Sequence, residues 1–155
     1  MEIIEENTVA FTGHRVVKKD FNFEDLIYTV ESLIIGGKDT FLIGMAIGFD
    51  TICFETLLKL KKSYPQIKIV ACIPCENQSK SWNFAQKIKY NYLLEKADEK
   101  IILGKEYSPN EMLKRNRFMV DNSSVLVAYI YKTVGGSYYT AKYAVENDKE
   151  IIYIK

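Results

Sequence analysis

The stretch Thr8-Val9-Ala10-Phe11-Thr12-Gly13-His14-Arg15 joins an apolar run to a turn with one glycine and two basic side chains. Its first half, residues 8–11, predicts a short β-strand that is nearly continuous in its apolar character. Strands without polar alternation are typical of parallel sheets that helices cover on both faces. The stretch therefore predicts an α/β fold in which a buried strand leads directly into a polar turn.

The same pairing of an apolar run with a helical pattern recurs along the chain. Further strands are predicted at 40–43, 67–73, 100–103, 125–131 and 151–154, and helices at 23–35, 50–63, 81–97, 109–121 and 136–146. In the helix at 81–97, the buried face is expected to carry Ala85, Ile88, Tyr92 and Leu93. The repeated β-α unit predicts one doubly wound, mostly parallel sheet with helices on both faces, a Rossmann-like single domain over residues 1–155.

Charge and hydropathy exclude several classes of protein. The 21 basic and 20 acidic residues give a net charge of +1, which argues against a general nucleic-acid binder. The polar start, residues 1–7, does not resemble a secretory signal, and Lys38-Asp39 interrupt the most apolar region before it reaches the length of a membrane span. We expect a cytoplasmic protein with no membrane partner.

The three cysteines favour free thiols over a metal or redox site. Cys72-Ile73-Pro74-Cys75 has the spacing of such sites, but zinc needs about four ligands and only Cys53 and His14 could complete the set. Cys72 lies inside an apolar strand, where a thioredoxin-like motif would open a helix. We expect Cys72 in the core, Cys75 in a loop and no metal.

Ligands of open parallel sheets bind beyond the carboxyl ends of the strands, so the turns that follow the strands are the candidate sites. In the first turn, Thr12 offers a hydroxyl and Gly13 permits close backbone approach. Arg15 carries a cationic fork suited to phosphate or carboxylate. On one interpretation His14 is an acid, a base or a hydrogen-bond donor to a phosphate; on the other it is a structural residue.

The second turn lies before the helix at 50–63. Two glycines at a helix N-terminus form a phosphate or ribose cradle, because free N–H groups and the helix dipole face the ligand. Asp50 either serves this site or caps the helix, and Glu55, further along the helix, points to the site or to solvent. The candidate residues here are Gly44, Met45, Ala46, Gly48 and Asp50.

Two more segments supply candidates. Gly135, Gly136 and Ser137 again place paired glycines before a helix start. On the helix at 109–121, Arg115 and Asn116 either read a base or ribose or belong to a solvated face. Ordinary tight turns are the alternative for both glycine pairs.

These segments in their order and spacing resemble the YpsA-like branch of the SLOG superfamily. The resemblance rests on Phe11-Thr12-Gly13-His14-Arg15, Gly44 to Asp50 with Glu55, Arg115 to Asp121, and Gly135-Gly136-Ser137 with Tyr139-Thr140 and Tyr143-Ala144. That superfamily includes the LOG phosphoribohydrolases and the DNA-processing protein DprA. The resemblance implies a Rossmann-like fold, homo-oligomers and a nucleotide-derived ligand at the strand ends.

The sequence departs from the catalytic pattern of the LOG enzymes, P-G-G-x-G-T-x-x-E. Val134 stands in place of the proline and Lys142 in place of the glutamate. The phosphate-loop role carries over to Gly135, Gly136 and Ser137, whereas the catalytic role does not, which leaves Asp50 and Glu55 as weak candidates.

The favoured function is therefore binding of an NAD/ADP-ribose- or AMP-type molecule, with no further cofactor identified. One alternative is a nucleotide N-glycosidase that uses Asp50 or Glu55. A second is a DprA-like nucleic-acid or protein-interaction module, which the near-zero net charge weakens for nucleic acid. The single tryptophan, Trp82, either covers a base or packs in the core or at an oligomer contact.

Overall fold

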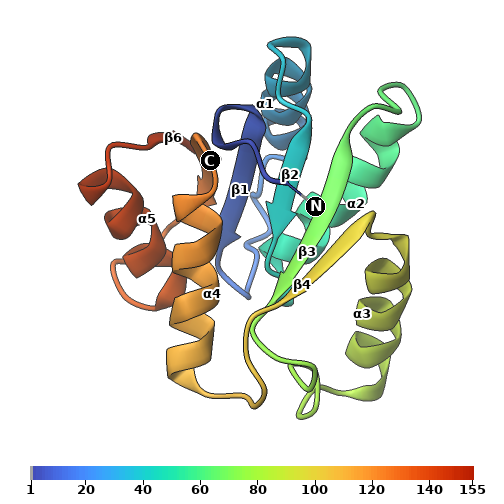
Figure 1. The fold of residues 1–155 in the computed structure, drawn as a ribbon, viewed down its shortest axis with the longest axis vertical. Coiled ribbons are helices and arrows are strands. Elements are labelled where there is room, and N and C mark those ends of the chain that lie inside the picture. The colour runs from blue at the N-terminus through green and yellow to red at the C-terminus, as the bar shows by residue number, and fades with distance from the viewer. Residues whose placement is uncertain (1) are drawn as a thin grey trace.

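Six parallel strands form one sheet in a computed structural model that describes residues 2–155 (Figure 1). The strands are β1 (Thr8–Gly13), β2 (Thr40–Ile43), β3 (Lys68–Ile73), β4 (Glu99–Ile102), β5 (Val125–Tyr129) and β6 (Glu150–Tyr153). The helices are α1 (Phe23–Ile35), α2 (Phe49–Lys61), α3 (Phe84–Lys96), α4 (Pro109–Asp121) and α5 (Gly136–Glu146), after a 3-10 turn, η1 (Glu5–Asn7). The predicted α/β Rossmann-like fold is confirmed.

The strand order places a switch point beside β1. Across the sheet the order is β4-β3-β2-β1-β5-β6, so the chain first builds outward from β1 to β4 and then returns to add β5 and β6 on the other side. Ala10 in β1 accordingly pairs with Leu42 of β2 and with Leu126 of β5. Such a reversal opens a crevice at the carboxyl ends of the two strands that flank it.

Side chains of β1 alternate between two hydrophobic layers. Val9 and Phe11 face the layer that contains residues of α1, α2 and α3, and Ala10 faces the layer under α4 and α5. Strands β1, β2 and β5 are buried along both faces almost throughout. The expectation of burial on both faces is wrong for β4 and β6, where every position is half-buried or exposed, because each edge strand has one neighbour and incomplete helix cover.

Helix α3 differs most from its prediction. It begins at Phe84 and not near Ser81, because Asn83 and Gln86 form a reciprocal capping box at its start. Ile88 and Tyr92 were expected in the core but are more than half exposed. The buried residues of the helix are Tyr90 and Leu93. α3 packs against α2 near the edge of the sheet that β4 forms (Figure 1). Its neighbours therefore cover only a narrow strip of the surface of α3.

The three cysteines are free and buried. Cys72 lies in β3 and Cys75 in the loop that follows, as expected. Within residues 2–155, no three His, Cys, Asp or Glu side chains come together as a metal site. None of the helices in this described part of the chain combines the length and the apolar character that crossing a membrane requires.

Candidate functional site

A crevice of about 260 Å³ opens at the switch point, beyond the carboxyl ends of β1 and β5. All four segments predicted from the sequence contribute to it. Its lining comprises Phe11, Thr12, Gly13, His14, Arg15, Gly44, Ala46, Asp50, Met112, Arg115, Asn116, Met119, Gly136 and Ser137.

The turn after β1 is held between the starts of two helices. Ser137, in the first turn of α5, donates its hydroxyl proton to the carbonyl oxygen of Gly13 at 2.6 Å. The N–H of Phe49, at the start of α2, donates to the carbonyl oxygen of His14 at 3.2 Å. The Phe49 ring occupies the place that a side chain at Gly13 would need. The backbone at residues 13–14 is therefore fixed between both helices.

These two helices are the ones that begin without a side-chain cap. α1, α3 and α4 each have a capping side chain, whereas α2 and α5 begin after Gly48 and Gly135. Both glycines have positive φ, 86° and 97°, which suits glycine. Backbone N–H groups in the first turn of a helix have no intrahelical acceptor. The two N-termini beside the crevice are therefore suited to an anion.

Arg115 carries a buried cation into the crevice wall from α4. Its side chain donates to the carbonyl oxygen of Gly44, to that of Cys72 at 3.2 Å and to Gln78 Oε1 at 3.3 Å. Its Nε donates to Asn116 Oδ1 at 2.9 Å. No ion pair within residues 2–155 includes Arg115. Burial lowers the pKa of the guanidinium, and the charge of the nearby Asp50 acts in the opposite direction, while the hydrogen bonds of the group go to carbonyl oxygens.

Asp50 is the one carboxylate in the lining of the crevice. The side chain is buried, and its Oδ2 accepts a hydrogen bond from the N–H of Ala46 at 3.1 Å. Burial raises the pKa of Asp50 to about 6, although Arg115, the Ala46 N–H and Arg15 act in the opposite direction. A carboxyl that titrates near neutral pH can act as an acid or as a base.

His14 lies against aromatic residues at the opposite side of the turn. Its ring meets that of Tyr131 edge to face, with centroids 4.4 Å apart. The N–H of Lys132 donates to its Nε2 at 3.4 Å, so the neutral ring carries its proton on Nδ1. Burial, and then the charge of Lys132, lower the pKa of the imidazole. The side chain lines the crevice as a neutral group.

Other predicted residues lie beside the crevice or away from it. Met45 and Gly48 line a neighbouring pocket, and Gly135 is the N-cap of α5. Glu55 is not brought to the crevice: it is exposed and pairs with Lys89 of α3 at 3.0 Å. Lys142, which stands where the LOG enzymes have glutamate, also lies outside the crevice.

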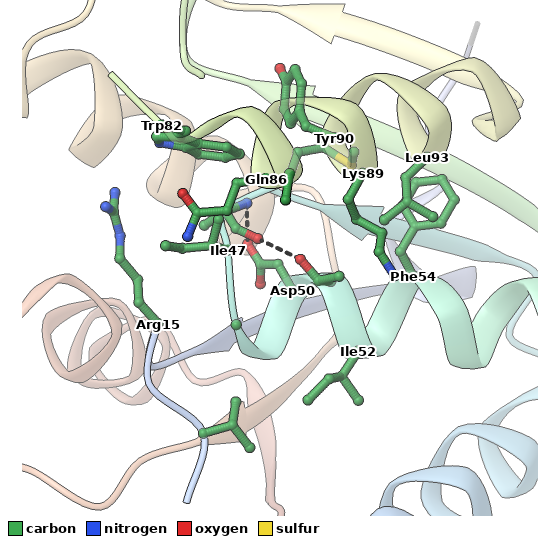
Figure 2. Close-up of a pocket in the computed structure, with 16 residues that line it drawn as sticks. Arg15, Ile47, Asp50, Ile52, Phe54, Trp82, Gln86, Lys89, Tyr90 and Leu93 are labelled. Atoms are coloured by element: carbon green, nitrogen blue, oxygen red, sulfur yellow. Dashed lines mark hydrogen bonds between the residues drawn. The ribbon is translucent and has the colours of Figure 1, made fainter. Parts of the chain in front are cut away.

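Sequence reasoning missed Met112 and Met119, which line the crevice from α4. Methionine is an ordinary apolar residue of a helix, so neither position carries a sequence signal for a site. Two larger hollows adjoin the crevice. One, here called the Trp82 pocket, lies between α2 and α3 and measures about 440 Å³ (Figure 2). The other, the α4–α5 groove, measures about 620 Å³.

A doubly wound sheet whose switch point meets two glycine-capped helices is a Rossmann-like fold with a crevice at its strand ends. Within that class, residues 14–154 match the model of the YpsA family, which is described as the YspA SLOG family. The chain belongs to this family.

Two curated relatives are similar over most of the chain. The uncharacterised SPbeta prophage-derived protein YoqJ of Bacillus subtilis is 33% identical over 134 residues, which cover 78% of each protein. A UPF0398 protein of Listeria monocytogenes is 29% identical over 130 residues, 75% of this chain and 70% of that protein.

Solved structures of DNA processing protein A (DprA) share the fold. The Streptococcus pneumoniae protein superimposes with a TM-score of 0.69 at 17% identity, over 97% of this chain and 50% of the other. The Helicobacter pylori protein, described for its mode of binding single-stranded DNA, superimposes with a TM-score of 0.70 at 19% identity. The match covers 96% of this chain and 65% of the other. The present chain thus spans half to about two thirds of these DprA chains.

Proposed function

We propose that the crevice binds a phosphate-bearing, nucleotide-derived small molecule of the AMP or ADP-ribose type. The observation that carries the proposal is the convergence of two glycine-capped helix N-termini, those of α2 and α5, on the Gly13 turn. Helix N-termini of this kind attract phosphate through free N–H groups and through the helix dipole.

The charges around the crevice favour the same class of ligand. Its lining contains two guanidinium groups, Arg15 and Arg115, and a single carboxylate, Asp50. Arg15 is exposed at the mouth and is free to turn toward a phosphate, with which its planar fork forms paired hydrogen bonds. Membership of the YpsA family of SLOG proteins supports a nucleotide over another anion, because the superfamily that the sequence resembles includes the LOG phosphoribohydrolases.

A binding series tests the proposal. The purified protein is titrated by calorimetry and by thermal shift with AMP, ADP-ribose, NAD and cyclic nucleotides. A ligand with a Kd of about 1 μM, present at 100 μM, would stabilise the fold by roughly 2.7 kcal/mol, which raises Tm measurably. Absence of any shift or heat at millimolar concentration of every ligand would reject the proposal.

Arg15→Ala provides the matched variant for whichever ligand binds. Loss of one charge-assisted fork contact is expected to weaken binding by about tenfold or more, with little change in stability because the side chain is exposed. Lys62→Ala is the control, since Lys62 is an exposed cation just after α2, remote from the crevice. Equal affinities of the two variants would exclude Arg15 from the site.

A second candidate function, hydrolysis of an N-glycosidic bond, rests on Asp50. As a base, this carboxylate would take a proton from water while the water oxygen bonds to the sugar C1′ and the C1′–N bond breaks, so that the nucleobase leaves and takes up a proton. Chromatography of nucleoside monophosphates incubated with the protein detects the released base. Release that persists unchanged in Asp50→Asn would reject this assignment.

A further inference from the structure

The Trp82 pocket lies directly beside the crevice and is mostly apolar. Helices α2 and α3 form its two sides, and the loop before α2 forms its floor (Figure 2). Met45, Ile47, Phe54 and Leu93 supply apolar surface, and the aromatic residues Trp82 and Tyr90 supply the rest of the wall on the α3 side. Its polar residues are Arg15, Asp50, Thr51, Gln86 and Lys89.

The indole of Trp82 is held in a fixed orientation at this wall. Its ring meets the buried ring of Tyr90 edge to face, with centroids 5.2 Å apart and planes at 84°. The backbone N–H of Trp82 donates to the carbonyl oxygen of Ser79 at 3.0 Å, and the capping box at Asn83 follows at once. Trp82 is only half-buried, so part of its surface remains available beside the pocket.

The pocket and the crevice are neighbours that share part of their lining. Arg15, Ala46 and Asp50 belong to both of them, so a ligand that extends past these three residues would reach from one space into the other. The crevice alone, at 260 Å³, is smaller than the roughly 300–1,000 Å³ usual for small-molecule sites. The additional 440 Å³ of the Trp82 pocket brings the composite site within that range.

We propose that the Trp82 pocket receives the heteroaromatic base of the ligand whose phosphate lies in the crevice. This inference rests on the proposed function and narrows it: the ligand is a nucleotide with its base attached, not a sugar phosphate. A flat ring would lie against the indole and contact Met45 and Ile47, while the amide of Gln86 lies within the same pocket for its polar edge. Aromatic stacking of this kind tolerates any base.

Asp50 lies at the junction between the two spaces, where the sugar of such a ligand would pass. A carboxylate at this position can accept hydrogen bonds from ribose hydroxyl groups, as acidic residues do in other Rossmann-like folds. Arg15 lines both spaces and is exposed, so its side chain, which extends toward the Trp82 end of the pocket (Figure 2), is free to turn toward the phosphate. In this arrangement the phosphate lies in the crevice, the sugar passes Asp50, and the base lies in the Trp82 pocket.

The α4–α5 groove is the competing place for the base. It adjoins the crevice through Met112, Asn116 and Gly136. Three tyrosines line it, but Tyr107 and Tyr139 are each more than half exposed, and the hydroxyl of Tyr143 is already bound to Asp121 at 2.7 Å. Arg15 and Asp50, the charged residues that line the crevice together with a second hollow, line the Trp82 pocket and not the groove. This difference favours the Trp82 pocket as the place for the base.

Because Trp82 is the only tryptophan, its fluorescence reports on this pocket alone. Wild-type protein is titrated with AMP, with ADP-ribose and with ribose 5-phosphate, which has no base. Calorimetry measures binding of each in parallel. We expect AMP or ADP-ribose to change the emission on binding, and ribose 5-phosphate to bind more weakly and leave the emission unchanged.

Two variants locate the base independently. Trp82→Leu is expected to weaken nucleotide binding by about 5- to 150-fold, the range of one aromatic stacking contact, without changing the affinity for ribose 5-phosphate. Trp82→Phe should restore much of the loss. Tyr139→Leu, in the groove, should leave nucleotide affinity unchanged.

The outcomes separate this inference from the function on which it rests. Nucleotide binding by calorimetry without a change in Trp82 emission, or with a loss in Tyr139→Leu instead, would overturn the pocket assignment and leave the proposed function standing. Equal affinities for AMP, ADP-ribose and ribose 5-phosphate would also overturn it. Failure of every nucleotide to bind would remove the proposed function and this inference together.

Discussion

Gly48 packs against the backbone of Arg15 so closely that the carbonyl group of Arg15 occupies the position that a Cβ on Gly48 would take. The two residues belong to different loops, one after β2 and one after β1. The φ of Gly48 is also positive, at 86°, which L side chains rarely adopt. This close approach places the turn after β1 against the N-terminus of α2, and both contribute to the lining of the Trp82 pocket.

Gly48→Ala is expected to lower the free energy of unfolding by more than about 2 kcal/mol, because backbone overlap adds to the strain of the positive φ. Chemical denaturation measures the change. Gly37→Ala is the matched control: Gly37 has a φ of +107° but no atom within 4 Å of the added Cβ, so only the strain, about 1 kcal/mol, applies. Equal decreases in the free energy of unfolding of the two variants would show that the contact with Arg15 does not contribute to the loss of stability.

The sequence predicted the helix limits well where a terminal signal was visible. Pro109 and Gly136 mark the starts of α4 and α5, and both helices begin at these residues. The start of α3 was misplaced, because the capping box that defines it uses Asn83 and Gln86, which were taken as helix interior. The exposed Ile88 shows the limit of periodicity: spacing identifies an apolar face but not how much of it a neighbour covers.

The site was harder to predict than the fold. Glycines before helices identified the loops, and the topology of the sheet brought these loops together in one crevice. No sequence pattern indicated that Arg115 points inward to the carbonyl oxygens of Gly44 and Cys72, since a basic helix residue is normally solvated. Sequence spacing also gave no means of separating Asp50, which is buried in the crevice, from Glu55, which is exposed on the same helix.

Asp50→Asn is expected to stabilise the fold at neutral pH. The raised pKa of about 6 means that native Asp50 keeps a proton that the unfolded chain, with a pKa near 3.8, has lost. Its contribution to stability therefore falls as pH rises from about 4 to about 6, by up to about 3 kcal/mol. Asparagine avoids the buried charge and can still accept from the Ala46 N–H.

Thermal unfolding across pH 4 to 8 checks this expectation. Asp50→Asn should be more stable than wild type at pH 7.5, and the difference should vanish near pH 4. Glu55→Gln is the control, because Glu55 is exposed on the same helix and should show no such pH-dependent gain. A difference that stays constant with pH would mean that the charge of Asp50 is not the cause.

Arg115→Leu is expected to destabilise the protein by about 3 kcal/mol or more. The substitution removes the guanidinium donor from the buried carbonyl oxygens of Cys72 and of the Gln78 side chain, and it leaves Gly44 with only the Gln78 amide at 3.3 Å; unsatisfied buried acceptors each cost about 1–3 kcal/mol. Lys114→Leu, one residue away and exposed, should change stability by no more than about 0.5 kcal/mol. Urea denaturation measures the free energy of unfolding of both variants. Equal losses would mean that the Arg115 guanidinium is not required for the stability of the fold.

His14 provides a direct test of the electrostatics of the crevice, because it is the only histidine and gives one resolvable imidazole signal by NMR. Its titration midpoint is expected below 6.5, mainly because burial disfavours the charged ring and secondarily because of Lys132. Lys132→Ala should therefore raise the midpoint only in part, while Lys62→Ala should leave it unchanged.

Since the folded pKa lies below the unfolded value, the stability that neutral His14 contributes is present above pH 6.5 and is lost as the pH falls through the folded pKa. A midpoint at or above 6.5 would mean that the imidazole is solvated, and that the wall formed by Tyr131 and Lys132 does not enclose it.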